Sequence, residues 1–275
     1  MFITDFNEIM DVLDSSPRTF LYDTVAISKH ELAYFRNNLQ LSKEFVENNP
    51  IIITQTILDE LKFRADTEER YTNFLKQFTK VILINETSFV KYFFEMYSPK
   101  QRSLSQYKKS AINSFRTIQP LAEAINNIKL EEAENKIIDL FYTYFSSGKN
   151  KGEYSLLWLS TVICEVFPKL GITFIGKDRD LYNIVDHCYY RFDSITSEIK
   201  SKSEVRILSD DSMLQALLRR GQSIESLVDY YRDEARKMLY RKIIDGITEP
   251  KITEGSMDNQ LFLENLNLGQ IEIIY

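Results

Sequence analysis

Short apolar segments that each give way to a polar residue and then to a helical pattern restrict the fold of this chain more than any other feature. Ile51 to Ile53, Val81 to Ile84 and Ile172 to Ile175 are rich in β-branched residues and too short for buried helices. Phe20 to Tyr22 and Val205 to Leu208 are further segments of this kind. Strands that alternate with helices along a chain form a parallel sheet covered on both faces. We therefore expect an α/β fold with a central parallel sheet.

The stretch from about residue 87 to residue 149 interrupts this alternation. It reads as helices rich in aromatic residues, Phe115 and Phe141 among them. We expect these rings to form the core of an inserted helical region. Residues 1–220 would then form one α/β domain that contains the insertion.

Residues 221–275 are expected to form a helical C-terminal extension. An amphipathic helix from about Ser223 to Ile244 would follow a helix stop at Gly221, and Ile271 to Tyr275 would be an edge strand or a docking segment. The apolar positions with helical spacing are Ile224, Leu227, Val228, Tyr231, Ala235, Met238 and Leu239. This stripe must be buried, either against the rest of the chain or as the interface of a homodimer or a protein partner.

Composition restricts the class of protein. The chain has 275 residues, 44% of them hydrophobic, which allows a sizeable core. No apolar run approaches the roughly 18 residues of a membrane span, and the acidic N-terminus is unlike a signal peptide. Cys164 and Cys188 lack partners at metal-ligand spacing, so we expect buried thiols and a cytoplasmic protein with no membrane contact. The net charge of −6 argues against nonspecific coating of nucleic acid.

Acidic residues follow several of the predicted strands. Asp23 comes directly after the first segment, Asp178 and Asp180 follow Ile175, and Glu60 lies about two turns into a helix. Glu153 opens a later helix. Because the carboxyl ends of parallel strands meet at one edge of a sheet, we expect these carboxylates to converge and repel one another. Mg²⁺ or Mn²⁺ would relieve that repulsion and promote attack of water on a phosphodiester.

The ordered segments that carry these acids resemble the PIN-domain family. They are Phe20-Leu21-Tyr22-Asp23-Thr24, the strand and helix from Ile51 to Leu61, Gly152-Glu153, and the segment from Ile172 to Leu181. PIN domains are metal-dependent nucleases, most often ribonucleases specific for single-stranded RNA, with a Rossmann-like three-layer α/β/α fold. The resemblance implies that Asp23, Glu60, Glu153 and Asp178 hold Mg²⁺ or Mn²⁺, with Asp180 as an auxiliary catalytic acid.

Two alternatives are considered beside this resemblance. A PIN-like scaffold without catalysis would serve as an RNA- or protein-binding subunit of a larger assembly. A phosphatase of the haloacid dehalogenase class would need a second Asp where Val25 stands, which disfavours it.

Several other polar residues have both a functional and a structural interpretation. Thr24 would hydrogen-bond Asp23 or a metal-bound water, or cap a helix. Lys177 and Arg179 would contact phosphate or remain solvated loop charges. Basic residues of the insertion would form an RNA-binding face or a plain solvated surface: Lys100, Arg102, Lys108, Lys109 and Arg116.

Overall fold

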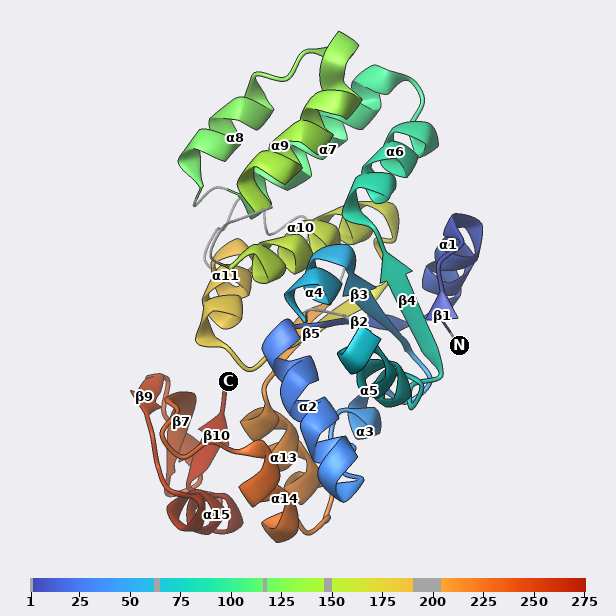
Figure 1. The fold of residues 1–275 in the computed structure, drawn as a ribbon. Helices are drawn as coiled ribbons and strands as arrows, with labels where there is room; N and C mark the ends of the chain where they lie inside the picture. The colour runs from blue at the N-terminus through green and yellow to red at the C-terminus, as the bar shows by residue number, and fades with distance from the viewer. Residues whose placement is uncertain (1, 62–64, 116–117, 146–149, 190–203) are drawn as a thin grey trace.

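A six-stranded parallel sheet forms the centre of the computed structural model, which describes residues 2–61, 65–115, 118–145, 150–189 and 204–275 (Figure 1). The strand order is β1-β4-β3-β2-β5-β6, and every neighbouring pair is parallel. The strands are β1 (Phe2–Ile3), β2 (Arg18–Tyr22), β3 (Pro50–Thr54), β4 (Lys80–Ile84), β5 (Gly171–Ile175) and β6 (Val205–Leu208). All residues of β3 and β5 are buried, as parallel strands covered on both faces require.

Helices cover both faces of this sheet, which confirms the expected Rossmann-like three-layer fold. The helices are α1 (Phe6–Ser15), α2 (Thr24–Asn37), α3 (Lys43–Val46), α4 (Gln55–Glu60), α5 (Ala65–Leu75), α10 (Lys151–Val166), α11 (Arg179–Tyr189) and α13 (Asp210–Arg219). In Figure 1, α10 and α11 lie on one face, and α2 and α5 lie on the other. Right-handed crossovers explain the division, because the chain moves from β2 through β3 to β4 in one direction and from β5 to β6 in the other.

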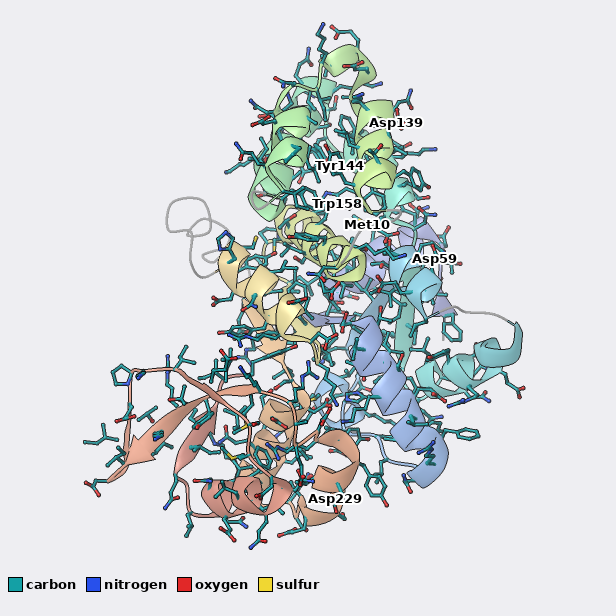
Figure 2. All side chains as sticks on the ribbon, turned by 60° about the vertical axis from the view of Figure 1, so that its left-hand side comes forward. Met10, Asp59, Asp139, Tyr144, Trp158 and Asp229 are labelled. Atoms are coloured by element: carbon teal, nitrogen blue, oxygen red, sulfur yellow. The ribbon has the colours of Figure 1, made fainter. Side chains whose placement is uncertain are left out.

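Between β4 and α10 the chain forms a separate helical lobe, as predicted for this region (Figure 1). Its helices are α6 (Glu86–Met96), α7 (Lys100–Ser114), α8 (Gln119–Asn126) and α9 (Ala133–Phe145). Phe115 and Phe141 are buried, as expected of core residues. Trp158 of α10 lies where the lobe meets the sheet domain, with its ring 5.1 Å from that of Phe141 (Figure 2). At the base of the lobe, Ser155 Oγ donates a hydrogen bond of 2.6 Å to Glu86 Oε1, so the two ends of the insertion meet.

The C-terminal extension is not mainly helical, and the prediction of one amphipathic helix from Ser223 to Ile244 is wrong. It contains α14 (Glu225–Tyr231), α15 (Asn259–Asn267) and an antiparallel sheet of β7 (Met238–Ile244), β8 (Ile247–Thr248), β9 (Thr253–Gly255) and β10 (Ile271–Ile273). Asp245 and Gly246 have φ angles of 51° and 78° and form the tight turn from β7 to β8. An Asp-Gly pair between apolar residues favours such a hairpin, and this local turn outweighed the helical spacing. The predicted strand near Ile271 is present as β10.

Two large apolar residues of α14 are fully buried within the chain itself. Val228 and Tyr231 have no exposed surface and belong to the same core as the central sheet. Leu41 N–H donates a hydrogen bond of 3.1 Å to Tyr231 Oη, which ties the extension to the loop after α2. Of the two alternatives for the predicted apolar stripe, burial against the rest of the chain therefore accounts for these residues, and an interface with a second copy or a partner stays a prediction.

Three smaller predictions concern the helix stop, the cysteines and the membrane. Gly221 has a φ of 79° directly after α13, as a helix stop requires. Cys164 and Cys188 are buried thiols, as expected. Among the helices of the described ranges, none combines the length and the apolar character of a membrane span.

Candidate active site

Three adjacent strands bring the predicted acids to one edge of the sheet. Strand β2 lies between β3 and β5, and all three end at this edge. Asp23 directly follows β2, and its N–H donates a hydrogen bond of 2.9 Å to Ile175 O at the end of β5. Asp178 lies shortly after β5, Glu60 ends the helix that follows β3, and Glu153 lies in the first turn of α10. The expected convergence at the carboxyl edge therefore follows from the strand order.

Hydrogen bonds from two other elements orient the Glu60 carboxylate. Thr24 Oγ1, at the start of α2, donates to Glu60 Oε2 at 2.6 Å, and Gly152 N–H donates to Glu60 Oε1 at 3.2 Å. The partner of Thr24 is thus Glu60 rather than Asp23. Asp23 itself caps α2, because its Oδ2 accepts a hydrogen bond of 3.2 Å from Val25 N–H.

Gly152 is required by the close approach of Glu60 to α10. A Cβ atom at this position would lie 2.4 Å from Glu60 Oε2 and 3.0 Å from Ile57 Cδ1. We predict that Gly152→Ala displaces the Glu60 carboxylate, and that loss of its hydrogen bond from Gly152 N–H destabilises the fold by about 1 kcal/mol. Thermal unfolding measures the loss. Gly255→Ala is the control, because its nearest neighbour would lie at an ordinary 3.5 Å; equal melting temperatures for the two variants would contradict the prediction.

The carboxylates at this edge repel one another. Burial, followed by the charges of Glu153 and Asp178, raises the pKa of Asp23 from 3.8 to about 7. Burial also raises the pKa of Glu153, and the charges of Glu60, Asp178 and Asp180 add to that increase. The five predicted acids are therefore close enough to influence one another's charge. Asp23 is the most buried of them, with 2% of its surface exposed.

The acids do not form a ready-made metal cage. In the part of the chain that the structure describes, no group of three or more His, Cys, Asp and Glu side chains is placed to hold a metal ion. Asp178 instead forms an ion pair with Arg236, with 2.9 Å between Oδ1 and Nη2. Tyr275 Oη donates a hydrogen bond of 3.1 Å to the main-chain oxygen of Asp178. The C-terminal extension thus contributes a cation and a hydroxyl to the site, which the local sequence patterns did not predict.

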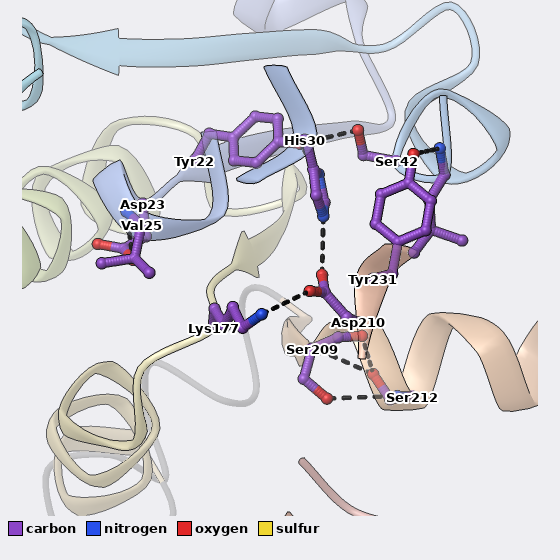
Figure 3. A network of polar contacts seen from close by, with 11 residues as sticks. Tyr22, Asp23, Val25, His30, Ser42, Lys177, Ser209, Asp210, Ser212 and Tyr231 are labelled. Carbon is purple, nitrogen blue, oxygen red and sulfur yellow. Dashed lines mark hydrogen bonds and ion pairs between the residues drawn. The ribbon is translucent and has the colours of Figure 1, made fainter. Parts of the chain in front are cut away.

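A buried polar network around His30 lies beside Asp23 (Figure 3). His30 Nε2 lies 2.7 Å from Asp210 Oδ1, and His30 Nδ1 hydrogen-bonds with the hydroxyl of Tyr22. Lys177 Nζ lies 3.7 Å from the other oxygen of Asp210. Although burial alone would raise it, the pKa of Asp210 is lowered by His30 and Lys177. Asp210 lies two residues after β6, at the start of α13, and this position near a strand end was the available sequence signal.

The two basic residues beside Asp178 already have acidic partners. Lys177 contacts Asp210, and Arg179 pairs with Glu254 of the extension. Lys177 and Arg179 are therefore not plain solvated loop charges, which was one of the two predictions for them.

The basic residues of the helical lobe have mixed roles. Lys108 Nζ donates to the main-chain oxygens of Asn126 and Ile128 at 2.7 and 2.8 Å, and so caps the end of α8. Lys100, Arg102 and Lys109 are exposed, whereas Arg116 lies outside the described residues. Lys108 therefore stabilises the lobe, and an RNA-binding face on these helices stays a prediction.

Comparison with family models, with curated proteins and with solved structures gives no match to this chain. The function is therefore inferred from the residues at the carboxyl edge of the sheet. Their charge, their burial and their partners define what the site can bind.

Proposed function

We propose that this chain is a PIN-like, metal-dependent ribonuclease that hydrolyses single-stranded RNA. The observation that carries the proposal is the mutual repulsion of Asp23, Glu153 and Asp178, which together with burial raises the pKa of Asp23 to about 7. Repulsion of this kind lowers the stability of the folded chain. The requirements of folding therefore do not explain why these acids lie together. Strongly perturbed carboxyls at the carboxyl edge of a parallel sheet are typical of catalytic and binding sites.

Mg²⁺ or Mn²⁺ fits the chemistry of this donor set, because all the candidate ligands are carboxylate oxygens. Mg²⁺ is commonly held by one or two carboxylates, while water and substrate phosphates complete its shell. That mode does not require three preformed protein ligands. Asp23, Glu60, Glu153 and Asp178 are the residues that would hold the ion. When bound, it supplies Lewis acidity and positive charge at the scissile phosphate.

The surrounding residues orient the carboxylates and balance their charge. Thr24 and Gly152 fix Glu60 from two sides, and the start of α2 fixes Asp23. Arg236, 2.9 Å from Asp178, brings a cation to the edge where a phosphate would approach. Its planar guanidinium suits paired hydrogen bonds to phosphate oxygens.

A second candidate function is a PIN-like scaffold without catalysis. The ion pair between Arg236 and Asp178 favours it, because it neutralises one carboxylate without a metal. The two candidates differ in one measurement. The nuclease cleaves a labelled single-stranded RNA when Mn²⁺ is added, whereas the scaffold binds the RNA and leaves it intact.

We predict that Mn²⁺ raises the melting temperature of the purified chain and that a chelator reverses the effect. An ion that binds only the folded state stabilises it by about 2.7 kcal/mol at a hundredfold excess over its dissociation constant. The shift should be larger at pH 8 than at pH 6, because protons compete for Asp23 below its pKa of about 7. Differential scanning fluorimetry at both pH values measures the two shifts.

Asp14→Asn is the matched control for this measurement. Asp14 is an exposed acid on α1, so its removal should leave the Mn²⁺ shift unchanged. A melting temperature that does not respond to millimolar Mn²⁺ at pH 8 would argue against the proposed metal site.

A further inference from the structure

A small cleft lies between the helical lobe and the carboxyl edge of the sheet, beside the acids. It has a volume of about 150 Å³ and is lined by the starts of α4, α6 and α10 on one side and by α9 on the other. Pockets for drug-sized ligands hold at least about 300 Å³, so this cleft takes only one flat group of a larger ligand.

One wall of the cleft is aromatic. Tyr142 of α9 lines it with 52% of its surface exposed, and Phe141 lines it as well, with its ring 6.1 Å from that of Tyr142 in an edge-to-face contact. An exposed tyrosine ring that is supported by a second ring offers a flat face for stacking. Such faces bind bases of any sequence, because every base has a π surface.

The opposite wall carries side chains that suit the edge of a base. Gln55 Nε2, at the start of α4, donates a hydrogen bond of 2.8 Å to Asp59 Oδ1 one turn later, which holds the two side chains together (Asp59 in Figure 2). Asn85 Oδ1 accepts a hydrogen bond of 3.0 Å from Thr87 N–H, so its Nδ2 remains as the donor group. Amide and carboxylate side chains of these types pair with the donors and acceptors of base edges.

The floor of the cleft is fixed and buried. Glu86, only 2% exposed, accepts hydrogen bonds from Thr56 N–H at 3.1 Å and from Ser155 Oγ at 2.6 Å. These bonds join α4, α6 and α10, so they fix the side of the cleft that faces α9.

The cleft is connected to the acidic site through neighbouring residues. Asp59 lines the cleft and precedes Glu60; Lys151 lines it and precedes Gly152, whose N–H binds Glu60. Among the described residues of the lining, Lys151 is the cation, so a phosphate of a bound nucleotide would lie on its side, toward the carboxylates.

We infer that this cleft binds one unpaired base of an RNA strand, stacked on Tyr142, and holds the adjoining phosphate near Lys151. The inference rests on the proposed ribonuclease function and gives the inserted lobe a role in substrate binding. A base in a helix is stacked and paired, so it cannot enter a cleft of this size. The cleft therefore selects single strands, and the acids act on the phosphodiester beside the bound base.

The test is binding of a fluorescein-labelled single-stranded RNA, followed by fluorescence anisotropy at low salt with EDTA, so that no metal-dependent cleavage occurs. Tyr142→Ala should weaken binding roughly tenfold, in the range that loss of one stacked base produces. Tyr230→Ala is the control, because Tyr230 is a comparably exposed tyrosine on α14, with 46% of its surface accessible. The same RNA annealed to its complement should bind more weakly than the single strand.

The inference is overturned if the full-length chain does not bind the single strand, if Tyr142→Ala binds as tightly as the unsubstituted chain, or if the duplex binds equally well. These outcomes are separate from failure of the proposed function. If RNA binding depends on Tyr142 but no cleavage occurs in Mn²⁺, the proposed ribonuclease function fails and the base-binding cleft stands. If RNA is cleaved at the same rate with and without the Tyr142 side chain, the ribonuclease function stands and the base-binding cleft fails.

Discussion

Asp23→Asn should abolish Mn²⁺-dependent cleavage of RNA and, at pH 8, raise the melting temperature of the chain. Asp23 is the most buried of the five acids, and the charges of Glu153 and Asp178 act on it directly. Loss of a central metal ligand should lower the cleavage rate by at least about a hundredfold, because ligands of one site act as a unit. Asparagine can still accept the hydrogen bond from Val25 N–H, so the start of α2 stays capped.

The gain in stability should depend on pH in a defined direction. The folded-state pKa of Asp23 is about 7, against an ordinary value of 3.8. The folded chain thus holds this proton more tightly than the unfolded chain does, and the carboxyl begins to cost stability as pH rises above about 4. The cost is complete above pH 7, where a shift of this size corresponds to roughly 4 kcal/mol.

Urea unfolding at pH 4 and pH 8, without metal, measures this dependence. Asparagine does not titrate, so the variant should exceed the unsubstituted chain in stability at pH 8 and match it at pH 4. Asp14→Asn, at an exposed position, should change neither value. Full cleavage activity of the Asp23 variant would remove Asp23 from the proposed site, whatever its stability.

Ending the chain after Gly221 should prevent stable folding. The truncation removes Ile224, Val228 and Tyr231, which have no exposed surface and pack into the core of the central sheet. Each large buried side chain is worth about 2–5 kcal/mol, so the three together approach the entire stability of a typical domain, about 5–15 kcal/mol. It also uncovers His30, whose ring lies 5.2 Å from that of Tyr231. We expect an aggregated product with no cooperative thermal transition.

Tyr230→Ala in the full-length chain is the control for this truncation, because it changes the exposed side of α14 and leaves its buried side intact. Its circular dichroism and melting temperature should stay close to those of the unsubstituted chain. A soluble, cooperatively folded truncation product would contradict this prediction and show that the rest of the chain folds without the extension.

The central sheet could be predicted from sequence because its signals are local. Ile51 to Ile53 and Ile172 to Ile175 carry both the β-branched composition and the short length of buried strands. The C-terminal extension could not be predicted from helical spacing alone, because the Asp245–Gly246 turn makes Met238 to Ile244 a strand of a hairpin. Two competing local patterns were present there, and the turn decided between them.

The candidate site was predictable only in part, for a related reason. Acids that follow strands can be located because the strand order brings strand ends together. The contact of His30 with Asp210 spans 180 positions of the chain, and that of Asp178 with Arg236 spans 58. No local pattern encodes such pairs, since the first joins α2 to α13 and the second depends on how the extension folds back over the sheet.

The hydrogen bond between Ser155 and Glu86 bears on how this architecture tolerates change. It holds the first and the last residues of the helical lobe together, so the lobe is an insertion whose two ends are adjacent in the sheet domain. When the ends of an inserted segment are adjacent, the entropy cost of closing it rises only slowly with its length. Insertions and deletions within the lobe therefore do not strain the sheet domain. The lobe can therefore diverge in size and sequence, and with it the choice of substrate, while the acids keep their positions.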